Sequence, residues 1–374
     1  MKTLYVPSPR KLENYRDADY LVSYQLLKLC DYSLELKTIR SDNLAFDFRF
    51  YSRLALSLAK RRLRLPIPRK WTLVLSQNYR MPIGDAESES ADAILTYQRY
   101  PINARLPVIW ITGSTDVVAL RRRPMAERDI QREIEFKREA NARAALTILP
   151  TYSMKRLFDD VICPSKPTYV IPMFHPIQPI AREQFLKKWN DLAKIKLLFV
   201  GRAAIAKGLA LVLDAYAILQ NRYPGRVSLH VVTTFQDGPV EVPSLPGLVQ
   251  ESLIPHVRVI ELMTESHYLL MPSVLEQYGL VYIEAMARGT IPLASDSPVQ
   301  RELLDEGHAG LLVERSAHAI AEAVAAGLED QDSVRELARR GMNFWKGCHA
   351  PEVIAAQFVS LANSALGRVA VPVI

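Results

Sequence analysis

The stretch EQYGLVYIEAMARGTIPLAS (276–295) contains a glycine turn, a helix and the start of a strand. The residues before it, HYLLMPS (267–273), form the short apolar run of a buried strand. GLVYIEAMARG (279–289) has apolar residues at helical spacing and ends at a glycine, and TIPLASD (290–296) then predicts the next strand. This alternation of strands and helices is typical of a doubly wound parallel sheet in an α/β protein.

Two glutamates mark this stretch, Glu276 at the turn and Glu284 within the predicted helix. In doubly wound sheets, ligands bind where strands end and helices begin, and a helix N-terminus favours a phosphate group. Gly279 would let the backbone approach such an anion closely. Carboxylates beside a phosphate site suit hydroxyl groups, such as those of sugars. Glu284 lies on an apolar helix, where an unpaired buried carboxylate would be costly, so the pair predicts a sugar and phosphate site.

The same alternation extends through the second half of the chain. Further strands are predicted at 194–202, 227–234 and 256–262, and further helices at 207–225, 317–330 and 333–345. The first half is less regular. Strands are predicted there at 3–8, 71–78 and 106–114, and helices at 18–30 and near 125–146. The proline-rich stretch 169–180 is the best linker, so we expect the domain boundary near 178–190.

Composition indicates a two-domain chain of 374 residues, with 49% hydrophobic residues to fill two cores. Residues 1–180 hold 29 Lys and Arg against 19 Asp and Glu, which predicts an anionic partner for this part. Cys30, Cys163 and Cys348 are too far apart for a disulfide framework. We find no signal peptide and no run of apolar residues long enough to span a membrane, so a cytoplasmic location is expected.

Three segments together resemble a known family. The first is LLMPSVLEQYGLVYIEAMARG (269–289), which carries an E-x7-E motif. The second is FVGRAAIAKGLALVLDA (199–215), which reads as a strand, a GR-x4-KG loop and a helix. The third and weaker match is SPVQRELLDEGHAGLLV (297–313). These features are similar to those of the retaining GT-B glycosyltransferases of family 4. The resemblance covers about 195–345 well and 1–180 only in outline.

The resemblance implies a GT-B fold, with two Rossmann-like domains facing across a cleft. An acceptor-binding domain would occupy 1–180, and a nucleotide-sugar-binding domain would occupy 190–349. A terminal helix at about 350–368 would pack back onto the first domain.

The resemblance also implies roles for individual residues. Glu276 would face the donor sugar, while Arg202 and Lys207 would bind the diphosphate and stabilise the charge that grows on it as the nucleotide leaves. Glu284 would hold the ribose hydroxyls. The donor site would be completed by Gly201, Gly279 and Leu280. No metal and no cofactor is then needed, because the nucleotide-sugar is itself a substrate.

The first half departs from the family pattern. Its first loop is Pro7-Ser8-Pro9-Arg10 where the family carries paired glycines, and residues 1–174 contain no histidine. Candidate contacts to the sugar or acceptor are Ser8, Thr112, Gly113 and Ser114, although the last three would equally suit a turn or helix cap. His175 lies in the linker and is interpreted as structural.

Two further motifs could bind a metal ion or an anionic partner. Asp17-Ala18-Asp19 is a D-x-D tripeptide, and because it precedes a predicted helix it is better explained by capping than by metal binding. KRRLRLPIPRKW (60–71) carries six basic residues and one tryptophan. It suits either a patch for the inner face of an anionic membrane or for a lipid-diphosphate acceptor, or an ordinary solvated helix end and turn. Its single aromatic residue does not favour nucleic acid.

The sequence therefore predicts a retaining, metal-independent glycosyltransferase of the hexosyl or a related class. It would move a sugar from a nucleoside-diphosphate sugar to a hydroxyl of a glycan, lipid-linked or small-molecule acceptor. Two alternatives stay open on the same fold: a non-catalytic accessory or glycan-binding protein, and a nucleotide-sugar epimerase.

Overall fold

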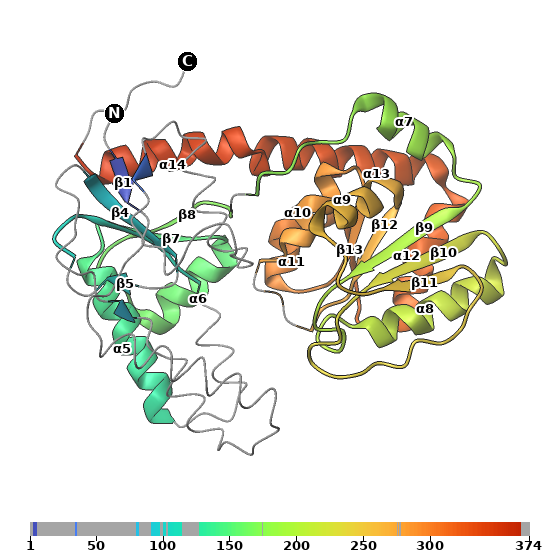
Figure 1. Cartoon of the computed structure of the whole chain (residues 1–374), viewed down its shortest axis with the longest axis horizontal. Coiled ribbons are helices and arrows are strands. Elements are labelled where there is room, and N and C mark those ends of the chain that lie inside the picture. The colour runs from blue at the N-terminus through green and yellow to red at the C-terminus, as the bar shows by residue number, and fades with distance from the viewer. Residues whose placement is uncertain are drawn as a thin grey trace. The chain divides into compact units, whose positions relative to one another are not determined.

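A computed structural model describes the chain over most of its length (Figure 1). The described residues are 3–5, 34–35, 80–81, 91–97, 100–101, 104–113, 127–173, 175–274, 276 and 278–367. The chain divides into two compact units. We call Met1–Phe174 with Ala355–Ile374 the N-terminal unit, and His175–Ile354 the C-terminal unit. The end of the chain is thus grouped with its beginning.

The C-terminal unit is built on six parallel strands (Figure 1). In chain order they are β9 (Ile195–Val200), β10 (Val227–Val232), β11 (Leu248–Glu251), β12 (Tyr268–Met271), β13 (Ile291–Ser295) and β14 (Leu311–Val313). Their order in the sheet is β11-β10-β9-β12-β13-β14. The direction in which strands are added therefore reverses between β9 and β12, which is the doubly wound arrangement of a Rossmann-like domain.

Helices precede, connect and follow these strands. They are α7 (Arg182–Asn190), α8 (Leu209–Arg222), α9 (His256–Glu265), α10 (Leu280–Ala287), α11 (Pro298–Leu303), α12 (Ala317–Glu329) and α13 (Gln331–Phe344), with the short 3-10 helix η2 (Asp305–Gly307) and the short π-helix η3 (Trp345–His349). Helices α8 and α12 pack together. Helix α10 is buried over most of its surface because it is apolar nearly all round, which fits a helix lying within the core.

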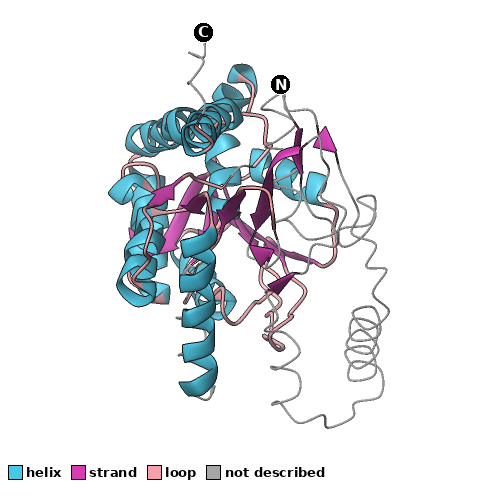
Figure 2. Cartoon of the chain, turned by 90° about the vertical axis from the view of Figure 1, so that its left-hand side faces the viewer, coloured by secondary structure: helices cyan, strands magenta, loops and turns pink. Residues whose placement is uncertain are grey.

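The N-terminal unit contains a second six-stranded parallel sheet, which Figure 2 shows from the side that faces left in Figure 1. Its strands are β1 (Thr3–Tyr5), β2 (Leu34–Glu35), β4 (Ala91–Tyr97), β6 (Val108–Ile111), β7 (Leu146–Leu149) and β8 (Thr168–Val170), in the order β2-β1-β4-β6-β7-β8. Two residues each of β3 (Arg80–Met81) and β5 (Tyr100–Pro101) pair separately. Helices α5 (Glu127–Arg143) and α6 (Tyr152–Ile162) follow β6 and β7.

Aromatic rings form the centre of the described core in this unit. Trp110 is fully buried and meets Tyr100 and Phe158 edge-on, with ring centroids 5.8 Å and 6.2 Å apart. Helix α5 adds Ile130 and Ile134, four residues apart, to the same cluster. Since this spacing places both side chains on one helix face, the charged sequence of α5 still provides an apolar stripe.

Most sequence predictions in the second half are confirmed, but one element is wrong. Residues 256–262, predicted as a strand, begin helix α9. The alternation of Val257 and Val259 suggested a strand, whereas the buried residues Val259, Leu262 and Met263 follow helical spacing. Strands β4, β7 and β11 and helices α6 and α7 were not predicted. The elements predicted at 18–30 and 71–78 lie outside the described residues.

A polar network fixes α7 to the sheet of the C-terminal unit. The Lys188 ammonium is buried and donates to the Thr290 hydroxyl at 2.7 Å, and burial holds its pKa well below the usual value. His267 accepts a hydrogen bond from the Lys196 backbone N–H at Nδ1, 3.0 Å away, so its Nε2 carries the proton and donates to the Lys188 carbonyl at 3.1 Å. Burial, with the nearby Lys188, lowers the pKa of His267 to about 4.

We predict that His267 makes the C-terminal unit sensitive to acid. Its pKa is 6.5 when unperturbed and about 4 in the fold. Between these pH values the unfolded chain binds a proton that the folded chain does not, so the free energy of unfolding falls as the pH falls. The loss from this group approaches about 3 kcal/mol by pH 4. Chemical denaturation at pH 7.5 and pH 4.5 should show a smaller acid loss for His267→Gln than for the wild type. An equal loss in both proteins would contradict the prediction.

Candidate functional site

The strand reversal of the C-terminal unit brings two loops together. Strands β9 and β12 are neighbours, with Leu197 paired to Tyr268 and Leu198 to Leu269. Because the two strands are parallel, the loops that follow them leave the same edge of the sheet. This is the place where ligands bind in doubly wound folds.

The loop after β9 contains Gly201, Arg202 and Lys207 and ends at Gly208. Arg202 is exposed, and its guanidinium has no hydrogen bond or ion pair to any described residue. Gly208 has φ +80°, and a Cβ there would lie 2.6 Å from the Pro272 carbonyl oxygen, so only glycine fits. This close approach packs the first loop against the end of β12.

A third segment, which follows β10, holds this loop in shape. The Asp237 carboxylate accepts hydrogen bonds from the backbone N–H groups of Ile205 at 3.2 Å and Ala206 at 2.7 Å. The Gln236 N–H donates to the Arg202 carbonyl at 2.8 Å. On the other side, the Val274 N–H donates to the Ala206 carbonyl at 2.9 Å. The predicted phosphate-binding loop is therefore fixed from both sides.

The loop after β12 leads into helix α10 through Gly279. Gly279 has φ +74°, and a Cβ there would lie 2.5 Å from the Tyr282 ring. It is the N-cap of α10 and has no side chain with which to cap the helix. Apart from the Tyr282 N–H, which donates to the Gly279 carbonyl at 2.9 Å, the N–H groups of the first turn, beginning with Leu280, are therefore available to an anion at the positive end of the helix.

The two loops are joined by an ion pair between predicted site residues. Lys207 Nζ lies 2.5 Å from Glu276 Oε2, and both side chains are largely buried. Ser273 Oγ lies 3.5 Å from the same carboxylate oxygen. Gly201 packs on the Lys207 side chain, since its Cβ would lie 3.0 Å from Lys207 Cγ. The structure thus brings three of the predicted residues, Gly201, Lys207 and Glu276, together in the C-terminal unit.

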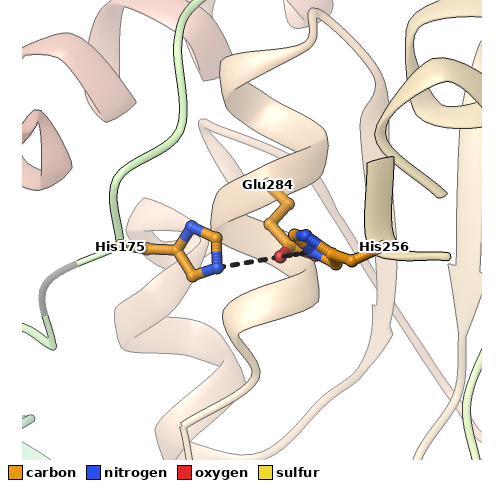
Figure 3. Close-up of side chains that lie close together, drawn as sticks. All are labelled: His175, His256 and Glu284. Atoms are coloured by element: carbon orange, nitrogen blue, oxygen red, sulfur yellow. Dashed lines mark hydrogen bonds and ion pairs between the residues drawn. The ribbon is translucent and has the colours of Figure 1, made fainter. Parts of the chain in front are cut away.

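Glu284 is paired in a way that the sequence did not indicate (Figure 3). Its side chain is buried, and its Oε1 lies 2.7 Å from His256 Nε2 and 3.0 Å from His175 Nε2. Burial alone would raise the pKa of Glu284, but the hydrogen bonds from the two histidines hold it below its usual value. The hydrogen bond to Glu284 raises the pKa of His256, against the opposing effect of burial.

Sequence reasoning missed both histidines as site residues. His175 was interpreted as structural, and His256 was placed in a strand, although it begins helix α9. Neither has a spacing to Glu284 that signals contact. The only clue was Glu284 itself, because a carboxylate on an apolar helix requires partners.

The predicted contacts in the N-terminal unit are only partly described. Ser8 and Ser114 lie outside the described residues, as do Asp17, Asp19 and the basic segment 60–71. Thr112 is fully buried after β6, and Lys137 Nζ donates to its hydroxyl at 3.3 Å and to the Gly113 carbonyl at 3.1 Å. Both predicted residues therefore have an internal partner, and their contact with a sugar or acceptor stays a prediction.

Comparison with known proteins shows which family the motifs of the C-terminal unit match. Residues 194–330 match the family model of the glycosyl transferases group 1. These residues form a glycosyl transferase group 1 domain. They include the GR-x4-KG loop and both glutamates of the E-x7-E motif, so the family resemblance of the motifs is confirmed.

Two curated relatives match less than half of the chain. The alpha-maltose-1-phosphate synthase of Mycolicibacterium smegmatis is 28% identical over 184 residues, which cover 44% of this chain and 46% of that protein. The D-inositol 3-phosphate glycosyltransferase of Corynebacterium glutamicum is 28% identical over 182 residues, or 46% of this chain and 43% of that one. The match thus spans about half the length of these relatives.

Solved structures extend the likeness to the whole fold. The structure of Anabaena Alr3699/HepE in complex with UDP-glucose has a TM-score of 0.65 and 15% sequence identity, and the match covers 97% of this chain and 100% of that one. With its two parallel sheets flanked by helices, the chain has the GT-B fold of two Rossmann-like domains.

The described part of the chain contains no helix long and apolar enough to cross a membrane. In that part the cysteines Cys163 and Cys348 form no disulfide.

We predict that Gly208→Ala destabilises the C-terminal unit more than Gly225→Ala does. Both glycines have φ near +75°, so both substitutions carry the left-handed backbone cost of roughly 1–2 kcal/mol. Only at position 208 does the new Cβ meet backbone, and this clash adds about 1–3 kcal/mol, whereas nothing lies within 4 Å of position 225. Urea denaturation should separate the two variants. Equal losses would show that the contact between Gly208 and Pro272 is not tight.

Proposed function

We propose that the chain is a retaining glycosyltransferase that uses a nucleoside-diphosphate sugar as its donor. The observation that carries the proposal is the pairing of Lys207 with Glu276 at the strand reversal, beside the uncapped end of α10. A cation, an acid and free backbone N–H groups at one edge match the parts of the donor, namely diphosphate and sugar. The group 1 domain at 194–330 supports transferase chemistry over the alternatives.

Arg202 and Lys207 would stabilise the leaving group. When the glycosidic bond breaks, negative charge grows on the outer phosphate of the departing nucleotide. A guanidinium, an ammonium and the N-terminus of α10 interact more strongly with that charge in the transition state than in the bound donor. The ion pair with Glu276 orients Lys207 before the donor arrives, so little reorganisation is needed. Chemistry of this kind requires no metal and no cofactor.

The remaining donor and acceptor contacts complete the proposal. Glu284 would accept hydrogen bonds from the ribose hydroxyls, and Glu276 would contact the transferred sugar. The acceptor would be a hydroxyl of a glycan, a lipid-linked molecule or a small molecule, bound by the basic N-terminal unit. A cytoplasmic location, with peripheral contact between segment 60–71 and an anionic membrane, belongs to the same proposal. HepE was solved with UDP-glucose, which makes UDP-glucose the first donor to test.

We predict that Lys207→Ala and Arg202→Ala each slow the release of nucleoside diphosphate from the donor by on the order of 100-fold. Lys155→Ala is the matched control, since Lys155 also pairs with a carboxylate, that of Asp159 on helix α6. The assay measures nucleoside diphosphate released from UDP-, GDP-, ADP- and dTDP-sugars, with and without candidate acceptors. No release from any donor would support a non-catalytic accessory or glycan-binding protein, and sugar interconversion without an acceptor would support an epimerase.

Retention gives a separate prediction. Once a donor and an acceptor are known, NMR of the product should show the same anomeric configuration as the donor sugar. Glu276→Gln should reduce the rate without changing this stereochemistry, because the carboxylate orients Lys207 and the sugar rather than choosing the face of attack. A product of inverted configuration would overturn the retaining assignment and leave the donor site unaffected.

A further inference from the structure

We propose that His175, His256 and Glu284 form a binding site for a divalent transition metal, and that Zn²⁺ bound there competes with the donor. The second part rests on the proposed function, in which Glu284 holds the ribose of the nucleotide. The first part stands on the geometry of the three side chains alone (Figure 3).

Three separate segments of the C-terminal unit supply the side chains. His175 precedes α7, His256 is the first residue of α9, and Glu284 lies within α10. One ligand atom from each lies within 4.8 Å of the other two. Figure 3 shows the two imidazole rings approaching the Glu284 carboxylate from different sides. Residues so far apart in the chain converge on one point only because the fold brings them there.

The donor set suits zinc. Two imidazole nitrogens and one carboxylate oxygen, with a fourth position open to water, make a common zinc coordination set. With zinc bonds near 2.0–2.1 Å, neighbouring ligand atoms in a tetrahedral site lie roughly 3.4 Å apart. The two N···O separations, 2.7 Å and 3.0 Å, are hydrogen-bond distances and are shorter than that value by roughly 0.7 Å and 0.4 Å. A small rotation of each imidazole would therefore admit the ion.

Charge and access also favour a cation. Glu284 is only 6% exposed, and a buried carboxylate is stabilised by a positive charge beside it. The His256 side chain is 59% exposed, which gives an ion a path from solvent and leaves room for a bound water. By the usual order of stability, Zn²⁺ should bind such a site more tightly than Mn²⁺ does.

Metal binding would change what Glu284 offers to the donor. A carboxylate oxygen bonded to Zn²⁺ is a weaker hydrogen-bond acceptor, and the ion with its water fills space beside the carboxylate. The ribose hydroxyls would then lose their partner. Zinc would thus weaken donor binding without touching Arg202 or Lys207.

The first experiment measures zinc binding without any donor. The untagged chain, stripped of metal by a chelator, is titrated with Zn²⁺ against a chromophoric competitor. We expect one site whose affinity falls at least roughly tenfold in His256→Ala and in His175→Ala. His230→Ala is the matched control, because His230 also pairs with a carboxylate, Glu251 at 2.7 Å, and should leave the affinity unchanged. Equal affinity in the wild type and both ligand variants would overturn the site.

A second readout guards against a variant that fails to fold. Replacing Zn²⁺ by Co²⁺ in the wild-type chain should give the intense visible absorption of a four-coordinate ion, and addition of Zn²⁺ should remove it. A weak spectrum typical of a six-coordinate ion would contradict the proposed ligand set. Circular dichroism of each variant checks that the C-terminal unit is intact.

The third measurement tests competition with the donor. Calorimetry with UDP-glucose and the other nucleotide-sugars is run with excess chelator and with saturating Zn²⁺. A donor affinity that falls in zinc in the wild type, but not in His256→Ala, supports the proposal. If zinc binds and leaves donor affinity unchanged, competition is overturned while the metal site stands. If no donor binds even in chelator, the proposed function fails, and the zinc titration still decides the site.

Discussion

The hydrogen-bonded pairing of β9 with β12 is the constraint on which the candidate site depends. Strands added to one side of β9 and to the other side of β12 leave helices on opposite faces of the sheet, and ligands of doubly wound folds bind at the strand ends between them. The loops that carry Lys207 and Glu276 leave this edge side by side. Without this pairing, the two motifs would lie on separate strands with no shared ligand. The order of the strands thus determines that these two loops, and the side chains they carry, lie together.

Within that frame, the fold of the C-terminal unit could largely be predicted from sequence. Short apolar runs predicted β9, β12 and β13, and helical spacing predicted α10, α12 and α13. The failure at α9 has a physical cause. Over seven residues the pattern of Val257, Val259 and Ile260 fits a strand and a helix about equally, and only packing decides between them. Strand β11 was missed because its residues are half exposed and carry no apolar run.

The residues of the candidate site also divide into those that local motifs predict and those that depend on packing. Gly201, Arg202, Lys207, Glu276 and Gly279 were predictable because local motifs place them on loops whose position follows from the strand order. The partners of Glu284 were not, because His175 and His256 come from distant segments and contact depends on how α9 and the linker pack against α10. Sequence could indicate that a buried carboxylate needed a partner but not which residue would be that partner.

The clamp on the loop after β9 has a consequence for binding. Asp237, Gln236 and Val274 fix the backbone of residues 202–206 through hydrogen bonds from two sides, and Gly208 locks its end against Pro272. Ordering one backbone residue costs roughly 1–2 kcal/mol of conformational entropy, which a flexible loop would lose each time a ligand bound. Here that cost is met once, when the chain folds. The loop is preorganised, so little of the favourable free energy of its contacts with an incoming anion is lost to ordering the backbone.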